Sequence, residues 1–182
     1  VEQTTGYCGG IFAQCFATMK GIRNMADFPN GLEGWSCAGI AGRCQPNAMS
    51  MVINGMSGNI HGTSYSGGIA GFGNAPANVD TVVNCMTGNI TSGAYCGGIW
   101  ALFNGLSGGS YTKFFNYMSG DISSTNASLG GGMFGRFEAN GTFTESINAM
   151  NGSCKDALIG ALGATQPTSL EITVDTSFGL IA

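Results

Sequence analysis

Small and large apolar residues alternate with polar ones in a pattern that recurs about every 30 residues along the chain. Its first motif is a pair of small residues, mostly Gly-Gly, followed by a large apolar residue and, two positions later, by Gly or Ala. The large residue recurs at spacings of 29, 29, 30, 34 and 29 residues, at Ile11, Ile40, Ile69, Ile99, Met133 and Leu162. A nearly fixed period of this length is typical of repeat architectures and divides the chain into six units.

A second motif follows half a unit later, with Asn, Met, Gly and Ile or Cys at every second position and variable residues between them. It occupies residues 54–60, 84–90, 116–122 and 148–154, and residues 22–28 carry a ragged version of it. Strict alternation predicts a short strand with one buried face. The first motif alternates small and large residues in the same way, so each unit is predicted to contain two short strands.

Two short strands in each unit predict an all-β fold, a β-solenoid of about six coils with a repeat of about 30 residues. We expect one domain over residues 1–182. Residues 1–7 would be an N-terminal extension and residues 8–165 the repeats, while residues 166–182 would be a capping strand or a strand exchanged with another subunit. At a strand spacing of about 4.8 Å, six coils would give a rod about 30 Å long. Its two ends would carry unpaired strand edges.

One asparagine opens the second motif in four successive units. We expect these side chains to form an internal ladder, in which each amide bonds to the amides above and below it: Asn54, Asn84, Asn116 and Asn148. Such bonds would offset a burial cost of roughly 1–3 kcal/mol for each amide. The alternative is that these asparagines occupy turns.

The composition restricts the function more than it identifies one. The chain has 182 residues, of which 32 are glycine and 9% are charged, with a formal net charge of -4. Nucleic acid is a poor candidate partner because no cationic residues cluster, and no apolar run reaches the roughly 18 residues of a membrane helix. With one histidine, His61, and few carboxylates, an enzyme is disfavoured. Asp80, Glu138 and Glu145 lie too far apart in the sequence to suggest an acid/base pair, and no cofactor is expected.

The chain resembles the GLUG-type repeats of bacterial surface adhesins and other secreted microbial proteins. The resemblance is carried by GGIAGF at residues 67–72, VNCMTGNI at residues 83–90 and GGI at residues 97–99, and it extends over roughly residues 8–165. It implies a surface or extracellular repeat protein and transfers no catalytic residues. The chain begins at Val1 without an initiator methionine, which we interpret as a processed end that fits secretion.

Seven cysteines favour an oxidising compartment. Because Cys8 and Cys15 recur one repeat later as Cys37 and Cys44, stacking would place Cys8 against Cys37 and Cys15 against Cys44, at a separation that a disulfide spans. Pairing of Cys8 with Cys15 is the alternative. We also expect a disulfide between Cys85 and Cys96. Cys154 takes an Ile position and is expected to be a buried thiol or, alternatively, an intermolecular bridge; metal binding by cysteines is disfavoured.

Four Asn-x-Ser/Thr sequons make glycosylation a candidate modification, at Asn89, Asn126, Asn140 and Asn151. The alternative is chance, because the chain is rich in Asn, Ser, Thr and Gly. His61 is expected at the surface or at a corner.

Large apolar residues beside the first motif are expected to face outward and to be covered on assembly: Phe12, Phe72, Trp100, Leu102 and Phe134. Corner loops of the same subunit are the alternative cover. The leading hypothesis is an extracellular structural protein that self-assembles by stacking into filaments or a surface sheath. The alternative is an adhesin-type module that binds carbohydrate or another surface. Ice binding ranks third, because the columns headed by Ser57 and Asn59 are irregular. The expected partners are further copies of the chain and glycans, with no nucleic acid and no membrane insertion.

Overall fold

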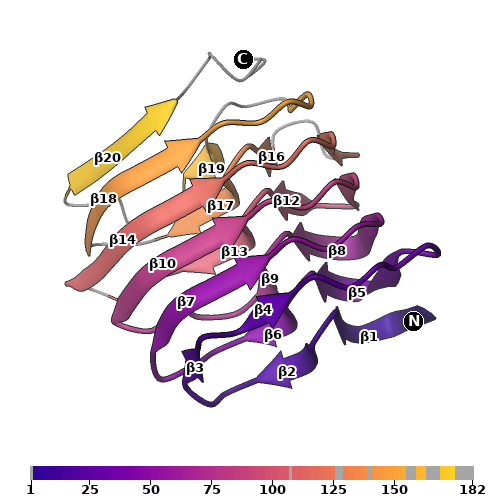
Figure 1. Ribbon diagram of the computed structural model, residues 1–182, viewed down its shortest axis with the longest axis horizontal. Helices are drawn as coiled ribbons and strands as arrows, with labels where there is room; N and C mark the ends of the chain where they lie inside the picture. The colour runs from indigo at the N-terminus through magenta and orange to yellow at the C-terminus, as the bar shows by residue number, and fades with distance from the viewer. Residues whose placement is uncertain are drawn as a thin grey trace.

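The computed structural model describes residues 2–106, 108–125, 129–138, 141–154, 159–162 and 169–174. These residues form a β-solenoid without helices, in which every strand pair is parallel. The chain winds around three sheets, and successive strands of each sheet stack from the N-terminus toward the C-terminus (Figure 1). The predicted all-β solenoid with a repeat of about 30 residues is therefore confirmed.

The three sheets receive their strands in turn, so that each circuit of the chain visits sheets A, B and C in that order. Sheet A contains β1 (Glu2–Gly9), β5 (Leu32–Ala38), β8 (Ile60–Gly67), β11 (Ile90–Ser92), β12 (Tyr95–Gly97), β15 (Ile122–Ser124) and β16 (Gly130–Gly131). Sheet B contains β2 (Phe12–Cys15), β6 (Ala41–Cys44), β9 (Ala70–Phe72), β13 (Trp100–Asn104), β17 (Phe134–Glu138) and β19 (Ile159–Leu162). Sheet C contains β3 (Met19–Lys20), β4 (Arg23–Asn24), β7 (Met49–Asn54), β10 (Asn78–Asn84), β14 (Gly109–Asn116), β18 (Gly141–Asn148) and β20 (Ser169–Val174).

The expected count of six coils is slightly too high. Four turns carry strands of at least three residues in all three sheets: β5–β7, β8–β10, β11–β14 and β15–β18. Before them, β1–β4 form what we call the N-terminal partial turn, because its sheet C side has only the two-residue strands β3 and β4. This is the unit whose second motif is ragged. After the four turns, β19 and β20 add one described strand each to sheets B and C.

The described residues of both terminal segments belong to the solenoid. Residues 2–7, expected to be an extension, are part of β1, and Glu2, Gln3 and Tyr7 pair with β5. Within the segment 166–182, β20 pairs in parallel with β18 of its own chain, which is the position of a capping strand, while residues 166–168 and 175–182 lie outside the described part.

The first five Gly-Gly-apolar motifs each form a corner between sheets A and B, whereas residues 160–162, expected to be the sixth, lie within β19, where Leu162 pairs with Phe137 rather than with Met133. At this corner two successive N–H groups donate to one carbonyl of the next turn: Ile99 N and Trp100 N both donate to Met133 O, at 2.9 and 3.0 Å. The alternation of inward and outward residues restarts at this point. Ile99 and Trp100 are consequently both buried, although they are neighbours in the sequence.

Two hydrophobic clusters fill the interior. The larger cluster lies between sheets B and C and includes the aromatic residues Trp100, Phe103, Tyr111, Phe114, Phe134, Phe137 and Phe143. The smaller cluster lies against sheet A and contains the repeated Met and Ile of the second motif, together with Cys8, Cys37, Cys96 and Cys154.

A column of glycines faces the column of asparagines inside the solenoid. A Cβ placed on Gly98 would lie 2.2 Å from Asn116 Nδ2 and 2.2 Å from Gly132 O, and Gly39 and Gly68 face Asn54 and Asn84 in the same way. No side chain fits at such a distance, so the second glycine of the motif is required where the backbone meets the asparagine.

The expected asparagine ladder is present and fully buried. Asn54 Nδ2 donates to Asn84 Oδ1 at 3.1 Å, Asn84 Nδ2 to Asn116 Oδ1 at 3.0 Å, and Asn116 Nδ2 to Asn148 Oδ1 at 2.9 Å. In the N-terminal partial turn, Asn24 Nδ2 donates instead to Gly39 O at 2.7 Å. These amides therefore link successive turns through the protein interior.

Candidate assembly surfaces

The N-terminal partial turn is the open end of the described stack. The strand orders of the three sheets end at β1, β2 and β3, and β4 pairs only with β7. Three large apolar side chains of this turn are exposed: Ile11 by 39%, Phe16 by 51% and Met25 by 63%. An end with unpaired backbone groups and exposed apolar side chains is suited to adding a further strand layer.

Two of the five residues expected on an outward assembly surface lie in the core instead. Trp100 and Phe134 are fully buried between sheets B and C, because the alternation restarts at the Gly-Gly corner that precedes each of them. Phe12 is half-buried and packs against the same cluster. Only Phe72 and Leu102 lie on the outward side of sheet B, where they are half-buried beside Arg43 and Arg136 in neighbouring strands.

Aromatic and arginine side chains form a row along the outer corner of sheets A and B, which we call the aromatic–arginine row: Tyr7, Trp35, Tyr65, Tyr95, Phe72, Arg43 and Arg136. Neighbouring rings lie 5.0 to 5.8 Å apart, and those of Tyr65 and Tyr95 are stacked at 5.5 Å. Partial burial and the nearby Tyr95 raise the pKa of Tyr65.

The two arginines of this row lie against the rings. The Arg43 guanidinium carbon lies 5.6 Å from the Tyr7 ring and 5.2 Å from the Phe16 ring. Arg136 Nη1 donates to the Tyr95 hydroxyl at 3.0 Å, and the same guanidinium pairs with Glu138. Because the rings and guanidinium groups cover one another's faces, the row chiefly stabilises the stacking of successive turns.

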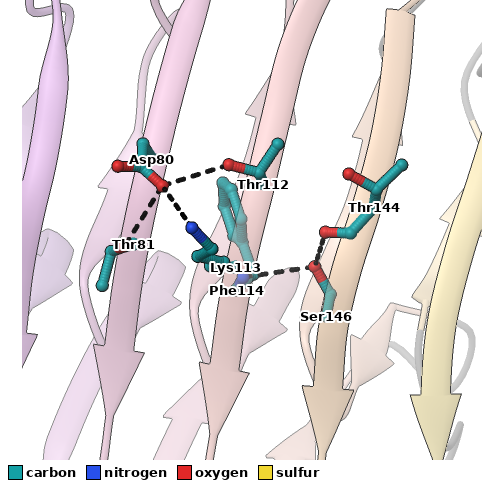
Figure 2. A network of polar contacts seen from close by, with 7 residues as sticks. All are labelled: Asp80, Thr81, Thr112, Lys113, Phe114, Thr144 and Ser146. Atoms are coloured by element: carbon teal, nitrogen blue, oxygen red, sulfur yellow. Dashed lines mark hydrogen bonds and ion pairs between the residues drawn. The ribbon is translucent and has the colours of Figure 1, made fainter.

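The outward side of sheet C carries a polar network and an apolar column. In the network, Asp80 Oδ1 accepts hydrogen bonds from Thr81 Oγ1 at 3.1 Å and Thr112 Oγ1 at 3.2 Å, and Lys113 Nζ lies 3.8 Å away (Figure 2). On the inward side of the same sheet, the buried Ser146 Oγ donates to Thr144 O and accepts from Phe114 N. The apolar column lies three positions along the strands from Asp80, at Ile53, Val83, Phe115 and Ile147.

The cysteines partly follow the predicted pairs. Cys8 and Cys37 are register partners in β1 and β5, and Cys15 and Cys44 are partners in β2 and β6; all are thiols in this structure. A hydrogen bond with Cys37 lowers the pKa of Cys8 to about 7, whereas the same bond and burial raise that of Cys37. In-register partners of parallel strands lie about 4.8 Å apart, within the range that a disulfide requires.

The expected pairing of Cys85 with Cys96 is not supported. Cys96 is fully buried in the cluster against sheet A, where Cys154 also lies, and burial raises the pKa of Cys96 to about 12. Cys85 is half-buried outside that cluster, and its Sγ lies 3.2 Å from a Cβ placed on Gly55. Cys154 aligns with Ile122 and is buried, as expected for its place in the Ile column.

Two of the four sequons lie on the described surface. Asn89 and Asn151 are exposed at the turn between sheets C and A, whereas Asn126 and Asn140 lie outside the described residues. Asn89 accepts a hydrogen bond from Asp121 N through Oδ1, which leaves its Nδ2, the atom to which an N-glycan attaches, out of this bond.

A polar column follows the same outer turn. Asn59 Oδ1 accepts from Asn89 N at 2.9 Å, and Asp121 Oδ1 accepts from Ser153 N at 2.7 Å and Ser153 Oγ at 2.8 Å. These bonds lower the pKa of Asp121. The hydrogen bonds of this column thus link successive turns. His61 is exposed, as expected, with Nδ1 2.8 Å from Thr91 Oγ1.

In the described part of the chain, no helix is long and apolar enough to cross a membrane. No protein-family model, curated protein or solved structure matches the chain. The resemblance to GLUG-type repeats therefore rests on the motif residues themselves.

Proposed function

We propose that the chain is an extracellular structural protein whose solenoid subunits stack end to end into filaments or a surface sheath. The observation that carries the proposal is the open N-terminal partial turn, with its unpaired edges and the exposed side chains of Ile11, Phe16 and Met25. A second copy supplies the covering layer.

The repeat itself supports a contact between the two ends of neighbouring subunits. Inside the subunit, β5 and β6 rest on β1 and β2 through parallel pairing, with Cys37 over Cys8 and Cys44 over Cys15. Because the units repeat, the underside of the N-terminal partial turn resembles the underside of the turn that rests on it. A contact between the opposite ends of two copies is heterologous and does not close, so it continues as a filament.

Low charge supports association. Only 9% of the residues are charged, and a formal net charge of -4 is spread over 182 residues. Natural solenoids and sheets use charged edges and capping elements to prevent further stacking. Secretion and glycosylation are part of the same proposal and are supported by the cysteine content and by the exposed Asn89 and Asn151.

Two edge variants test end-to-end stacking. Phe12 donates its N–H to Ile40 O, so the N–H of the exposed Ala13, the next residue of β2, points to the open edge. Ala13→Pro removes that donor, and Phe16→Glu places a carboxylate at the end while keeping a partner for Arg43. Leu106→Glu is the matched control, because Leu106 is 50% exposed but lies on the loop between β13 and β14.

We expect both edge variants to slow polymer growth, measured by light scattering and electron microscopy, by tenfold or more relative to the control. Equal growth of all three variants would contradict end-to-end stacking through this edge.

Carbohydrate or surface binding is the second candidate, and the aromatic–arginine row is the observation that favours it. The half-buried Trp35 and the Tyr65 hydroxyl are among its outward groups. Saturable quenching of Trp35 fluorescence by a polysaccharide, measured in a Trp100→Phe background and lost in Tyr65→Ala, would support this candidate. A glycan array without hits would count against it.

A further inference from the structure

We infer that the outward side of sheet C is a lateral interface, at which two copies pack face to face with their solenoid axes antiparallel. This inference does not depend on end-to-end stacking. The interface would centre on what we call the sheet C column, which consists of Ile53, Val83, Phe115 and Ile147. These residues are register partners in β7, β10, β14 and β18, and each is half-buried.

Exposed apolar side chains widen this column into a patch. Met51 is 51% exposed beside Ile53, and Tyr117 is 40% exposed with its ring 6.1 Å from that of Phe115. Met25 is exposed at the N-terminal end of the patch, next to Gly55. Three of the six large apolar side chains that are exposed in the described residues therefore lie on this one face. A continuous apolar patch of this kind marks an interaction site.

Residues with positive φ produce this face. At the same position of five successive sheet C segments, φ is 66, 54, 62, 59 and 52°, at Gly21, Met51, Thr81, Lys113 and Glu145. Each left-handed residue shifts the phase of alternation by one. Val79 and Val82 consequently both point into the core, while Asp80 and Val83 both lie on the outward side. The left-handed conformation is unfavourable for residues other than glycine, yet it recurs in four turns.

Charges at the two ends of the patch identify the occupant as a second copy in the antiparallel orientation. Lys20 and Arg23 flank Gly21 at the N-terminal end, and Glu145 occupies the equivalent position four strands later. Among the described residues, the ion pairs are Lys113 with Asp80 and Arg136 with Glu138, so these three charges are left for an external partner.

A two-fold axis running along β10 brings these charges together. It places Ile53 opposite Phe115 of the second copy, and it places Glu145 opposite Gly21, between Lys20 and Arg23. The parallel arrangement would instead set Glu145 against Glu145. The antiparallel pairing therefore matches apolar residues with each other and Glu145 with Lys20 and Arg23. Asp80, which the axis sets opposite Asp80 of the second copy, keeps its charge paired with Lys113 within each copy.

The same axis places each outward residue of β10 opposite the same residue of the second copy. Cys85, which directly follows β10, is half-buried and lies in the outward column of Gly55 and Tyr117, as shown by equivalent backbone bonds of these residues to the preceding turn. In the antiparallel pair the two Cys85 side chains face each other. In an end-to-end stack they would be separated by the length of a subunit, roughly 29 Å for six strands of sheet B at about 4.8 Å.

Cross-linking with a short bismaleimide tests the pairing directly. We expect a covalent dimer linked through Cys85 in the unmodified sequence and none in Cys85→Ser. Reintroducing a thiol as Val83→Cys in the Cys85→Ser background restores the dimer, whereas Thr63→Cys, an exposed position on sheet A of the same turn, does not.

Charge reversal tests the orientation. Glu145→Lys should slow cross-linking through Cys85 tenfold or more, and Lys20→Glu with Arg23→Glu in the same chain should restore it. Phe16→Glu, which blocks the end, leaves the cross-link intact, so failure of end-to-end stacking is distinguishable. A chain that yields no Cys85 dimer, or in which Glu145→Lys changes nothing, overturns the inference.

Discussion

Asn116 joins three turns of the solenoid: it accepts a hydrogen bond from Asn84 Nδ2 at 3.0 Å, and its own Nδ2 donates to Asn148 Oδ1 at 2.9 Å. The same Nδ2 also donates to Gly132 O at 2.6 Å. All three asparagines are fully buried. Each buried amide of the ladder therefore depends on its neighbours for hydrogen-bond partners. The ladder also fixes the position of each turn relative to the next along the solenoid axis.

Removing this amide should be costly. Asn116→Ala removes the partner of a buried Asn84 donor and one partner of Asn148, while Gly132 O keeps its bond from Gly98 N. Loss of a buried hydrogen bond in this way costs about 1–3 kcal/mol for each group left unsatisfied. We expect a loss of at least about 2 kcal/mol in the free energy of unfolding, measured by urea denaturation. Asn104→Ala is the matched control, because it removes an Asn–Asn bond between turns, from Asn104 Nδ2 to Asn74 Oδ1, at an exposed site. Equal losses in the two variants would argue against the buried ladder.

The glycine that faces the ladder should tolerate no side chain. In Gly98→Ala the new methyl group would meet Asn116 Nδ2 and Gly132 O at 2.2 Å, which forces the backbone apart and costs about 1–3 kcal/mol or more. Gly130→Ala is also buried, but the nearest atom to its Cβ is Cys96 Sγ at 3.3 Å. We expect thermal unfolding to shift clearly for Gly98→Ala and little for Gly130→Ala. The reverse order would contradict the close approach of the two columns.

Oxidation should link the N-terminal partial turn to the turn above it. With a small disulfide as oxidant, the Cys8 thiolate attacks first, because its pKa is lowered to about 7, and Cys37 resolves the mixed disulfide. Peptide mapping should find Cys8–Cys37 and Cys15–Cys44, and each closed loop should stabilise the fold by about 3 kcal/mol. The Cys37→Ser variant should lack the Cys8–Cys37 disulfide. Recovery of Cys8–Cys15 or Cys85–Cys96 as the main product would contradict the observed register.

Asp121 should make the outer turn sensitive to acid. Hydrogen bonds from Ser153 lower its pKa in the folded state, so its contribution to stability is present above its ordinary pKa, near 3.8, and is lost as the pH falls through the lowered value. Asp121→Asn keeps an acceptor in the position that Asn89 fills one turn below, but it cannot titrate. The urea midpoint of the unmodified chain should therefore fall more steeply below about pH 4 than that of Asp121→Asn. Parallel pH profiles would disprove this role.

The repeat and the ladder could be predicted because both depend on strict alternation within a strand. Asn54 and Asn84 recur at inward positions of the second motif, and stacking places them one above the other. The same reasoning failed for Trp100, because Ile99 N and Trp100 N share one carbonyl at the Gly-Gly corner and the alternation restarts there. It failed for Phe134 because Met133 and Phe134 are likewise neighbours that are both buried after a Gly-Gly corner.

The sheet C face had no signal in the sequence. A left-handed residue in a sequence is usually expected to be glycine. At this position of sheet C, however, Gly21 is followed in the next four turns by Met51, Thr81, Lys113 and Glu145, which adopt the same conformation with side chains. The expected pairing of Cys85 with Cys96 is not supported, because the turn between them places Cys85 outside and Cys96 inside the cluster against sheet A. The surroundings of these residues depend on how the turns stack in three dimensions, which the spacing of residues in the sequence does not predict.

Electron cryo-microscopy of the purified chain at high concentration tests the central claim, end-to-end stacking, most directly. We expect filaments with a strand spacing of about 4.8 Å along the axis and an axial rise of roughly 29 Å per subunit, in which the N-terminal partial turn of one subunit pairs with the opposite end of the next. A monodisperse, unpolymerised chain at the same concentration, or filaments in which β1 and β2 remain unpaired, would contradict it.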